Sequence, residues 1–438
     1  MISQAPVYNL MVALKETGLK ADVLRAWERR YDLPHPQRTA GRQRLYSDYD
    51  IATIKWLKNK QAEGLSISRA VQLWKDLLAA GGDPLKDSAD VKSSTYISPS
   101  DGMSIEILRQ QWLEGCLAFD AVKAEDALNQ AFALYPVEKT CSAVLRQGLN
   151  TIGEQWYFGK ISVQQEHFSS SLAMRRLETL LSAAPQPTRP QTVLVGCPAG
   201  EMHTFPAIML SLFLQRKGLK VVYLGADIPI EQMDTTIEAI HPDLVVLSAQ
   251  QLVSAASLSA ASLVLHERHI PLAYGGLIFN RVPDLRQRIA ATFLGESLEA
   301  ATDQIEQLIQ SPATPSLIQL DEKYKALAQS FRLSRSLIEK ELNAALYRDR
   351  VQIEYIEEVN SFFGSDLAAA LDLGDPTFME VELIWIDGLL TSHHLPGEQL
   401  QSYLGAYRRG VQAVLSEDGN PISQWIDQYI TRHQKTES

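Results

Sequence analysis

Cysteine is scarce in this 438-residue chain, and long hydrophobic runs are missing. The three cysteines, Cys116, Cys141 and Cys197, are far apart and odd in number. This excludes a disulfide scaffold and a Cys-x-x-Cys metal site, and it favours a reduced, cytoplasmic setting. No apolar run approaches the ~18 residues of a membrane span. Polar residues also interrupt the first segment, where a signal peptide would need an apolar core. We therefore expect no membrane partner.

Acidic residues are in excess, giving a net charge of -11, but they are unevenly distributed. Residues 1–80 contain 13 Lys or Arg against 8 Asp or Glu, a net of +5, whereas the remaining residues carry -16. A basic head on an acidic body indicates one nucleic-acid-binding module attached to a body with another task.

The length of the chain alone suggests about three domains of ~150 residues. Composition and periodicity divide it further. Short β-branched runs at 193–196, 221–225 and 244–248, separated by helical stretches, predict a parallel, doubly wound sheet. The predicted segments are a helical head (1–80), a Gly/Ser/Asp/Pro-rich linker (81–103), a helical block (104–188), an α/β domain (189–311) and a helical C-terminal domain (316–438).

The basic head has the layout of a DNA-reading module. Leu24, Trp27 and Tyr31 recur at helical spacing, so the arginines between them point largely to the other side. The adjacent segment TAGRQRLY (39–46) is basic and contains glycine, which suits a wing along a phosphate backbone. Arginine binds phosphates and guanine edges through a planar fork that lysine lacks. A solvated helical domain that binds protein is the alternative.

The strings WERRY, GRQRLYSDYD and EGLS make residues 5–78 resemble the winged helix-turn-helix domain of the MerR family. Such modules work as dimers on paired half-sites of double-stranded operator DNA. The resemblance implies that the DNA-facing residues are Arg25, Arg29, Arg30, Arg42, Arg44 and Tyr46.

The segment GEMHTFP (200–206) follows the first predicted strand, at the edge where parallel sheets bind ligands. His203 can coordinate a metal through one ring nitrogen, while Glu201 holds the other nitrogen and fixes the tautomer. A surface histidine is the simpler interpretation of the motif alone. Small residues after the later strands leave room for a long ligand tail; they are Ser248, Gly275 and Gly276.

This layout, together with YLGADIP (223–229), resembles the cobalamin-binding Rossmann-like domain of methionine synthase and the adenosylcobalamin mutases. The resemblance implies that His203 is the lower cobalt ligand in place of the cofactor's benzimidazole. It also implies that the cofactor's tail lies beside the serine and the glycine pair. The chain departs from the family at Pro206, where glycine is usual, and at Glu201, where many members have aspartate.

The string EQWYFGKISVQQEH (154–167) resembles the four-helix cap of CarH-type, or LitR-type, light-responsive regulators. The resemblance implies that Trp156 covers the upper corrin face and that Glu166 and His167 lie near the adenosyl group; an isolated helical tryptophan is more often core. The family usually has a histidine after the tryptophan that becomes the upper cobalt ligand after photolysis. Tyr157 stands there instead, and a neutral phenol is a poor substitute. Either another group such as His167 or water takes the upper position, or the photochemistry differs, or the protein senses another signal.

The C-terminal residues 317–438 have a net charge of -8 and many aromatic residues. A helical bundle with an aromatic core is the simplest interpretation. A pocket for a bilin such as biliverdin is the sharper alternative, in which His393 and His394 contact a propionate or a metal. A domain for partner binding or oligomerisation is a third.

Together these features predict a multidomain transcription regulator that is not an enzyme. Its predicted parts are an all-α winged helix-turn-helix head, a four-helix cap, an α/β Rossmann-like domain and an all-α C-terminal bundle. Light or a ligand would change the oligomeric state of the protein, a dimer or tetramer, and thereby its affinity for DNA. The alternatives are a bilin-sensing regulator, a corrinoid-carrying methyltransferase subunit, and a repressor that has lost cobalamin because of Pro206 and Tyr157.

Overall fold

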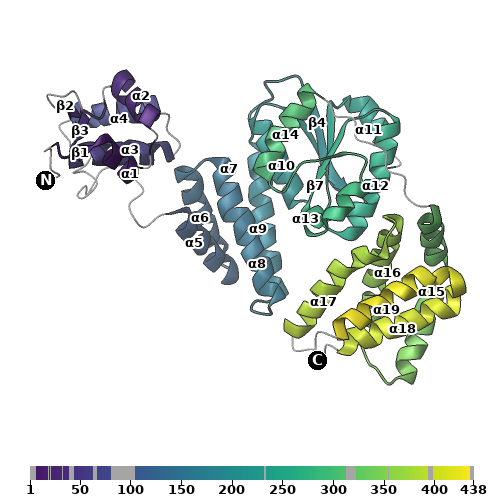
Figure 1. Ribbon diagram of the computed structural model, residues 1–438. Helices are drawn as coiled ribbons and strands as arrows, with labels where there is room; N and C mark the ends of the chain where they lie inside the picture. The colour runs from purple at the N-terminus through teal and green to yellow at the C-terminus, as the bar shows by residue number, and fades with distance from the viewer. Residues whose placement is uncertain are drawn as a thin grey trace. The chain divides into compact units, whose positions relative to one another are not determined.

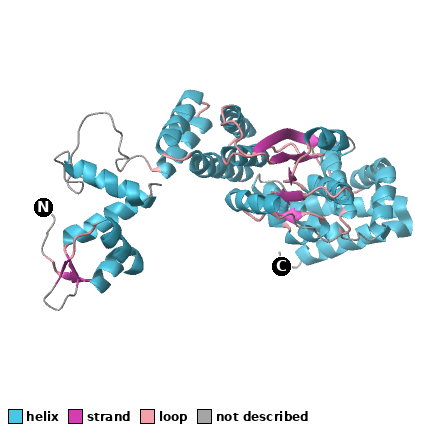
Figure 2. Ribbon diagram, turned by 90° about the horizontal axis from the view of Figure 1, so that it is seen from above, coloured by secondary structure: helices cyan, strands magenta, loops and turns pink. Residues whose placement is uncertain are grey.

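The computed structural model divides into two compact units, residues 1–98 and 99–438, which are considered separately (Figures 1 and 2). Three predicted features, Arg42 in the wing, the linker 81–103 and the pair His393-His394, lie outside the described residues. The structure describes residues 6–17, 19, 21–31, 33–38, 44–62, 67–79, 104–230, 233–311, 322–353, 355–392 and 398–434.

The N-terminal unit is a helical head with a small antiparallel sheet, so the all-α expectation misses its strands. The sheet order is β1-β3-β2; β2 precedes the segment predicted as a wing (39–46), and β3 forms the last three residues of that segment. Leu24, Trp27 and Trp74 are buried in its core, as the helical spacing of the first two predicts. The elements are β1 (Tyr8–Asn9), α1 (Leu10–Thr17), α2 (Ala21–Tyr31), β2 (Gln37–Arg38), β3 (Arg44–Tyr46), α3 (Asp48–Ala62) and α4 (Ile67–Ala79).

The second unit begins with the predicted four-helix block, in which α7, a π-helical segment and α8 form one continuous helix. Trp112 fills its centre, and a Cβ at Gly148 would lie 2.5 Å from the indole ring, so the close approach requires glycine. The last helix starts at a capping box between Ser162 and Gln165. The elements are α5 (Ile105–Leu117), α6 (Ala121–Leu134), α7 (Val137–Thr140), the π segment (Cys141–Arg146), α8 (Gln147–Tyr157) and α9 (Val163–Ser182).

The predicted parallel sheet is present, with order β5-β4-β6-β7-β8 and helices on both sides (Figure 2). Side chains of β4 alternate between the two faces: Val193 and Val195 pack toward α10 and α14, and Leu194 packs toward α12. The elements are β4 (Thr192–Pro198), α10 (Phe205–Arg216), β5 (Lys220–Ile228), α11 (Met233–Ile240), β6 (Leu244–Ser248), α12 (Leu252–Glu267), β7 (Leu272–Gly275), α13 (Leu277–Arg281), a 3-10 turn (Pro283–Arg288), β8 (Thr292–Phe293) and α14 (Leu298–Gln310).

The strand order fixes where a ligand can bind. The chain leaves β4 for β5 on one side and later returns to β6 on the other, so β4 and β6 flank a topological switch point. Ligands of open α/β sheets bind outside the carboxyl ends of strands at such a point. The loops after β4 and β6 are therefore the structural candidates for the site.

The C-terminal helices form a bundle that shares one hydrophobic core with α12 of the α/β domain, so they are not a separate tail. Its centre is aromatic: the rings of Phe363 and Tyr407 are 4.5 Å apart, and the Tyr403 hydroxyl donates to Asn360 Oδ1. No helix of the described residues is both long and apolar enough to cross a membrane. The elements are α15 (Glu322–Arg348), α16 (Ile356–Asp372), a 3-10 turn (Pro376–Met379), α17 (Glu380–Ser392), α18 (Glu398–Leu415), a 3-10 turn (Ser416–Gly419) and α19 (Asn420–Gln434).

Candidate functional site

The loop between β4 and α10 presents a histidine with one ring nitrogen held and the other accessible. Nδ1 of His203 lies 2.7 Å from Glu201 Oε1, and the His203 backbone N–H donates to the same oxygen. The His203 side chain is 59% exposed, and Nε2 has no partner among the residues that the structure describes. A neutral imidazole that donates from Nδ1 keeps its lone pair on Nε2, the arrangement a metal ligand needs.

Glu201 is fully buried and accepts four hydrogen bonds, which explains how a carboxylate is tolerated there. Its other oxygen, Oε2, accepts from the backbone N–H of Gln250 at 2.6 Å and from the Ser254 hydroxyl at 2.7 Å. Burial opposes the charged form, but these bonds and those from His203 outweigh it and hold the pKa of Glu201 below its usual value. The hydrogen bond to Glu201 raises the pKa of His203 against the effect of burial.

The small residues predicted near a ligand tail lie together at the ends of β6 and β7, where Ser248 pairs directly with Gly275. Gly276 has φ 129°, and a Cβ there would meet the Ala249 carbonyl oxygen at 1.7 Å, so this backbone requires glycine. A Cβ on Gly275 would meet nothing within 4 Å. The first glycine thus leaves open space, and the second allows two strand ends to approach.

Three residues that sequence reasoning left out hold the two loops in place. Gln250 donates from Nε2 to the Ser248 hydroxyl and accepts from the Leu277 backbone N–H. Asp227, at the end of β5, accepts from the Gly200 backbone N–H. Ser254 is the third, through Glu201. Their position at or just after strand ends was the available signal.

Pro206, the departure noted in the sequence, occupies the first turn of α10. Backbone N–H groups in the first turn of a helix have no partner within the helix, so proline removes no helical bond there. The loop that carries His203 is therefore compatible with this substitution.

In the cap, the first turn of α9 carries Glu166, whose charge acts on His203 of the α/β domain. Glu166 Oε2 lies 2.7 Å from Nδ1 of His167, and Ser170 donates to Glu166 Oε1. The negative charge of Glu166 contributes to the raised pKa of His203, so the two groups are within electrostatic range. Trp156, at the end of α8, is half-buried. The structure thus brings Glu166 of the cap near the histidine loop of the α/β domain.

A bare metal ion does not suit this donor set. Within the described parts of the chain, no group of three or more His, Cys, Asp or Glu side chains could hold an ion. One imidazole with an accessible Nε2 suits a metal that arrives already surrounded by a macrocycle, as cobalt does in a corrin. The residues present therefore fit cobalamin.

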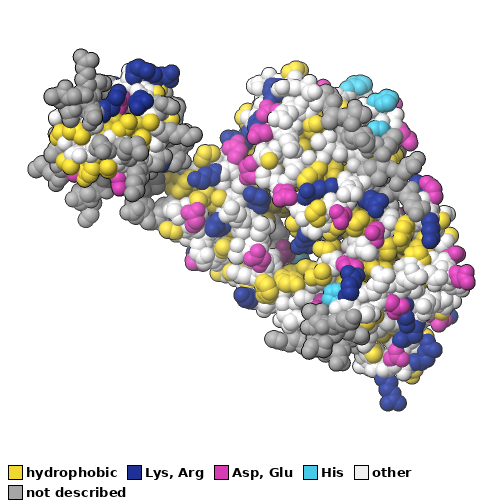
Figure 3. Space-filling view, in the orientation of Figure 1, with side chains coloured by type: hydrophobic (Ala, Val, Ile, Leu, Met, Phe, Trp, Pro, Cys, Tyr) yellow, Lys and Arg dark blue, Asp and Glu magenta, His cyan; other side chains and the backbone are white. Residues whose placement is uncertain are grey.

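The head exposes basic side chains on α2, where Arg25, Arg29 and Arg30 are all exposed; Figure 3 shows Lys and Arg side chains gathered over this helix. Two other residues predicted to face DNA, Arg44 and Tyr46, instead bind Glu28 of α2. Glu28 accepts from Arg44 Nε at 2.7 Å and from the Tyr46 hydroxyl at 2.6 Å. Tyr46 is fully buried, contrary to its expected exposure, because its ring fills the core and its hydroxyl ties β3 to α2.

We expect Arg29→Ala to weaken operator binding. Loss of one phosphate or base contact costs ~1–3 kcal/mol and, for a phosphate contact, lowers the salt slope by about one. Titration of DNA at several salt concentrations measures both. Lys55→Ala is the matched control, since it removes the same charge from α3, where Lys55 pairs with Glu16. Equal affinities for the two variants would contradict the assignment of α2.

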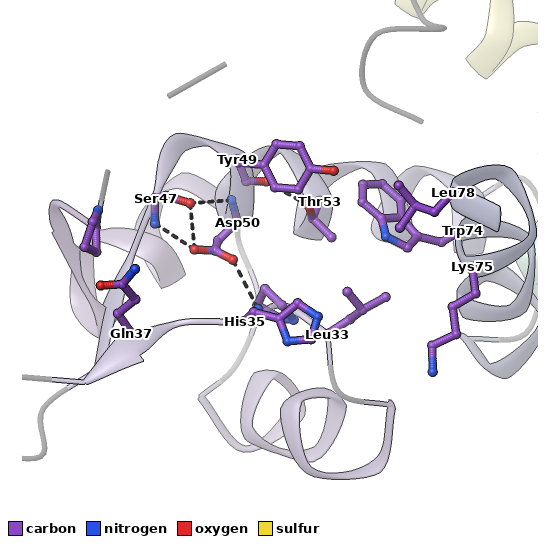
Figure 4. A pocket seen from close by; sticks show the side chains of 12 residues that line it. Leu33, His35, Gln37, Ser47, Tyr49, Asp50, Thr53, Trp74, Lys75 and Leu78 are labelled. Atoms are coloured by element: carbon purple, nitrogen blue, oxygen red, sulfur yellow. Dashed lines mark hydrogen bonds between the residues drawn. The ribbon is translucent and has the colours of Figure 1, made fainter. Parts of the chain in front are cut away.

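A cavity of about 400 Å³ in the head lies beside the start of α3 (Figure 4). Asp50 faces it, but its carboxylate accepts from the Ser47 backbone N–H and hydroxyl and from the His35 backbone N–H. The Ser47 hydroxyl in turn accepts from the Asp50 N–H, as in a capping box. This acid therefore stabilises the start of α3.

Both units contain segments that match known protein families. Residues 8–77 match the MerR HTH family of regulatory proteins, and residues 108–181 and 191–303 match two B12 binding domain families. The chain is 30% identical to the HTH-type transcriptional repressor CarH of Myxococcus xanthus, over 66% of this chain and 95% of CarH. It is 31% identical to the repressor CarA of the same organism, over 53% of this chain and 73% of CarA.

A solved structure is also similar to part of this chain. The monomethylamine corrinoid protein of Methanosarcina barkeri is 19% identical, with a TM-score of 0.38, and the match covers 46% of this chain and 96% of that protein.

Proposed function

Since this chain belongs to the CarH-type family of MerR-family B12-binding transcription regulators, we propose that it binds adenosylcobalamin and responds to light. It is a regulator rather than an enzyme, with a DNA-binding head and a cobalamin-binding body. In this proposal, illumination changes the oligomeric state of the chain and thereby its affinity for an operator.

The observation that carries the proposal is the pair His203–Glu201. A fully buried carboxylate fixes Nδ1 as the donor and leaves Nε2 accessible at the carboxyl edge of the sheet. A surface histidine would not need a buried acid with four hydrogen-bond donors behind it. In the proposal, the buried carboxylate orients the imidazole so that Nε2 can bind cobalt.

The other residues have distinct roles in the proposal. Ser248, Gly275 and Gly276 accommodate the tail of the cofactor, while Trp156 shields the opposite side, and Glu166 and His167 lie near the adenosyl group. When bound, adenosylcobalamin supplies a cobalt–carbon bond that visible light breaks. Trp156 would then lose a neighbour on its cofactor side, so the cap would move.

We propose that cap movement reaches DNA through assembly. Heads joined in a dimer or tetramer bind linked half-sites with avidity, so separating them weakens binding more than any single contact would. The basic side chains of α2 attract the DNA phosphates electrostatically.

Two of the alternatives that the sequence left open, a methyltransferase subunit and a bilin site, have different outcomes. A corrinoid-carrying methyltransferase subunit is wrong, because the relatives that match most of the chain are HTH-type transcriptional repressors and this chain itself matches the MerR HTH family. A bilin site stays a prediction. Several of the aromatic residues that suggested it pack on one another in the bundle core, as Phe363 does on Tyr403 and Tyr407.

The test is to purify the full chain with adenosylcobalamin in the dark and record absorption spectra and sedimentation before and after green light. We expect a bound-cobalamin spectrum that changes on illumination, together with a change in mass. A bound cofactor with an unchanged spectrum and unchanged mass would remove light as the signal. A protein that takes up no corrinoid would remove the cofactor as well.

A further inference from the structure

Helix α17 of the C-terminal bundle lies beside the end of α8 in the cap (Figure 1), where Trp385 contacts Trp156. The Tyr157 hydroxyl donates to the Trp385 carbonyl oxygen at 3.2 Å. The two rings also lie together, with centroids 5.8 Å apart. These residues are 228 positions apart in the chain, so the contact joins two separate parts of the fold.

A glycine on α17 makes room for this contact. A Cβ at Gly388 would lie 1.8 Å from the Tyr157 hydroxyl oxygen, a distance that real Cβ atoms do not show. Gly388 follows Trp385 by three positions, so both are on the same face of α17. Glycine is unfavourable inside a helix, and the close approach of Tyr157 gives a reason for it here.

The contact extends to the residue assigned to the cofactor. Trp385 also packs against Trp156, with ring centroids 6.2 Å apart and planes 32° apart. Trp156 and Tyr157 are consecutive, so movement of one changes the position of the other relative to α17. Trp385 therefore has a direct contact with the side chain that would lie over the corrin.

The rest of α17 is fixed in the C-terminal bundle. Glu380 forms an ion pair with Arg432 of α19, and Leu383 is fully buried in the shared core. Glu382 lies within electrostatic range of Arg281 on α13. One end of α17 thus belongs to the bundle, while its face around residues 385–388 rests on the cap.

We propose that Tyr157, Trp385 and Gly388 form a latch that holds the C-terminal domain on the cap and transmits movement of Trp156 to that domain. Tyr157 then acts as a docking residue rather than as a cobalt ligand, because its hydroxyl donates to a main-chain carbonyl of α17 and its ring lies against Trp385. The transmission part rests on the proposed function, whereas the latch itself requires no cofactor.

Hydrogen exchange of the full chain without cofactor tests the latch. Gly388→Ala places a methyl group against the Tyr157 hydroxyl, so we expect amides of 385–392 to exchange about tenfold faster than in the unaltered chain. Gly405→Ala is the matched control, since this glycine lies in α18 of the same bundle and a Cβ there would meet nothing within 4 Å. Equal exchange in the two variants would overturn the latch.

A double variant separates the latch from general damage to α17. Tyr157→Phe removes the clashing oxygen, and the ring carbon that remains would lie 3.0 Å from the new Cβ. We expect Gly388→Ala to have little further effect in this background, a non-additive result that applies only to residues in contact. Additive effects would contradict the contact.

Adding adenosylcobalamin in the dark tests transmission. We expect exchange in α17 to change in the unaltered chain but not in Gly388→Ala. Cobalamin uptake, read from the absorption spectrum, with no change in α17 would overturn transmission while the latch could still stand. Absence of uptake would instead count against the proposed function.

Discussion

His203→Ala should reduce the affinity of the chain for adenosylcobalamin by at least about 100-fold, the largest binding effect that we expect from one substitution. The variant loses the protein's nitrogen donor, and Glu201 loses its ring partner. Equilibrium dialysis in the dark, with the absorption spectrum of the retained cofactor, measures this loss. The fold should remain, because the imidazole is largely exposed.

His266→Ala is the matched control for this substitution. His266 lies in the last turn of α12. Since helices run opposite to the strands they connect, that turn lies at the far edge of the sheet from His203. It should bind cobalamin as the unaltered chain does. If both histidine variants keep full affinity, the assignment of His203 as ligand is wrong.

Glu201→Gln should have the largest effect on stability, lowering the free energy of unfolding by ~3 kcal/mol. Two carboxylate oxygens accept from His203, Gln250 and Ser254 in a fully buried position. The amide nitrogen of glutamine cannot accept, so some of these donors lose their partner. Denaturant unfolding of the full chain, followed by circular dichroism, measures the change.

Glu306→Gln serves as the control in the same domain. Glu306 pairs with Lys217 and Arg189 in partly exposed ion pairs, which contribute ~0–1 kcal/mol. We also expect Glu201→Gln to weaken cobalamin binding by about 10–100-fold, because the imidazole is no longer held. Equal stability of the two variants would show that the buried network is not what fixes the loop.

The strands of the α/β domain could be predicted because local patterns determine them. The apolar runs at 193–196, 221–225 and 244–248 lie inside β4, β5 and β6. The strands β4 and β6 are buried along their whole length and require continuous apolar residues, whereas β5 is an edge strand that is only partly buried. Ser248 and Gly275, which were singled out at the ends of predicted strands, are paired neighbours in β6 and β7, a register that the sequence did not predict.

The features that escaped prediction depend on contacts between distant residues. Nothing near Glu201 in the sequence indicates that Gln250 and Ser254 complete its hydrogen bonds, because that requires the β4 and β6 loops to meet. Tyr157 was unusual by resemblance alone, and its contact with Trp385 depends on how the bundle docks. A tyrosine in a wing motif likewise does not show that its ring will be buried, as that of Tyr46 is.

The central claim is that Nε2 of His203 binds cobalt, and magnetic resonance tests it most directly. The chain is produced with ¹⁵N-labelled histidine and loaded with cobalamin in its Co(II) form, and the nitrogen splitting is recorded by electron paramagnetic resonance. An axial nitrogen from the protein gives doublets with the label, and the account predicts these. Triplets, which the cofactor's own unlabelled base would give, would contradict it.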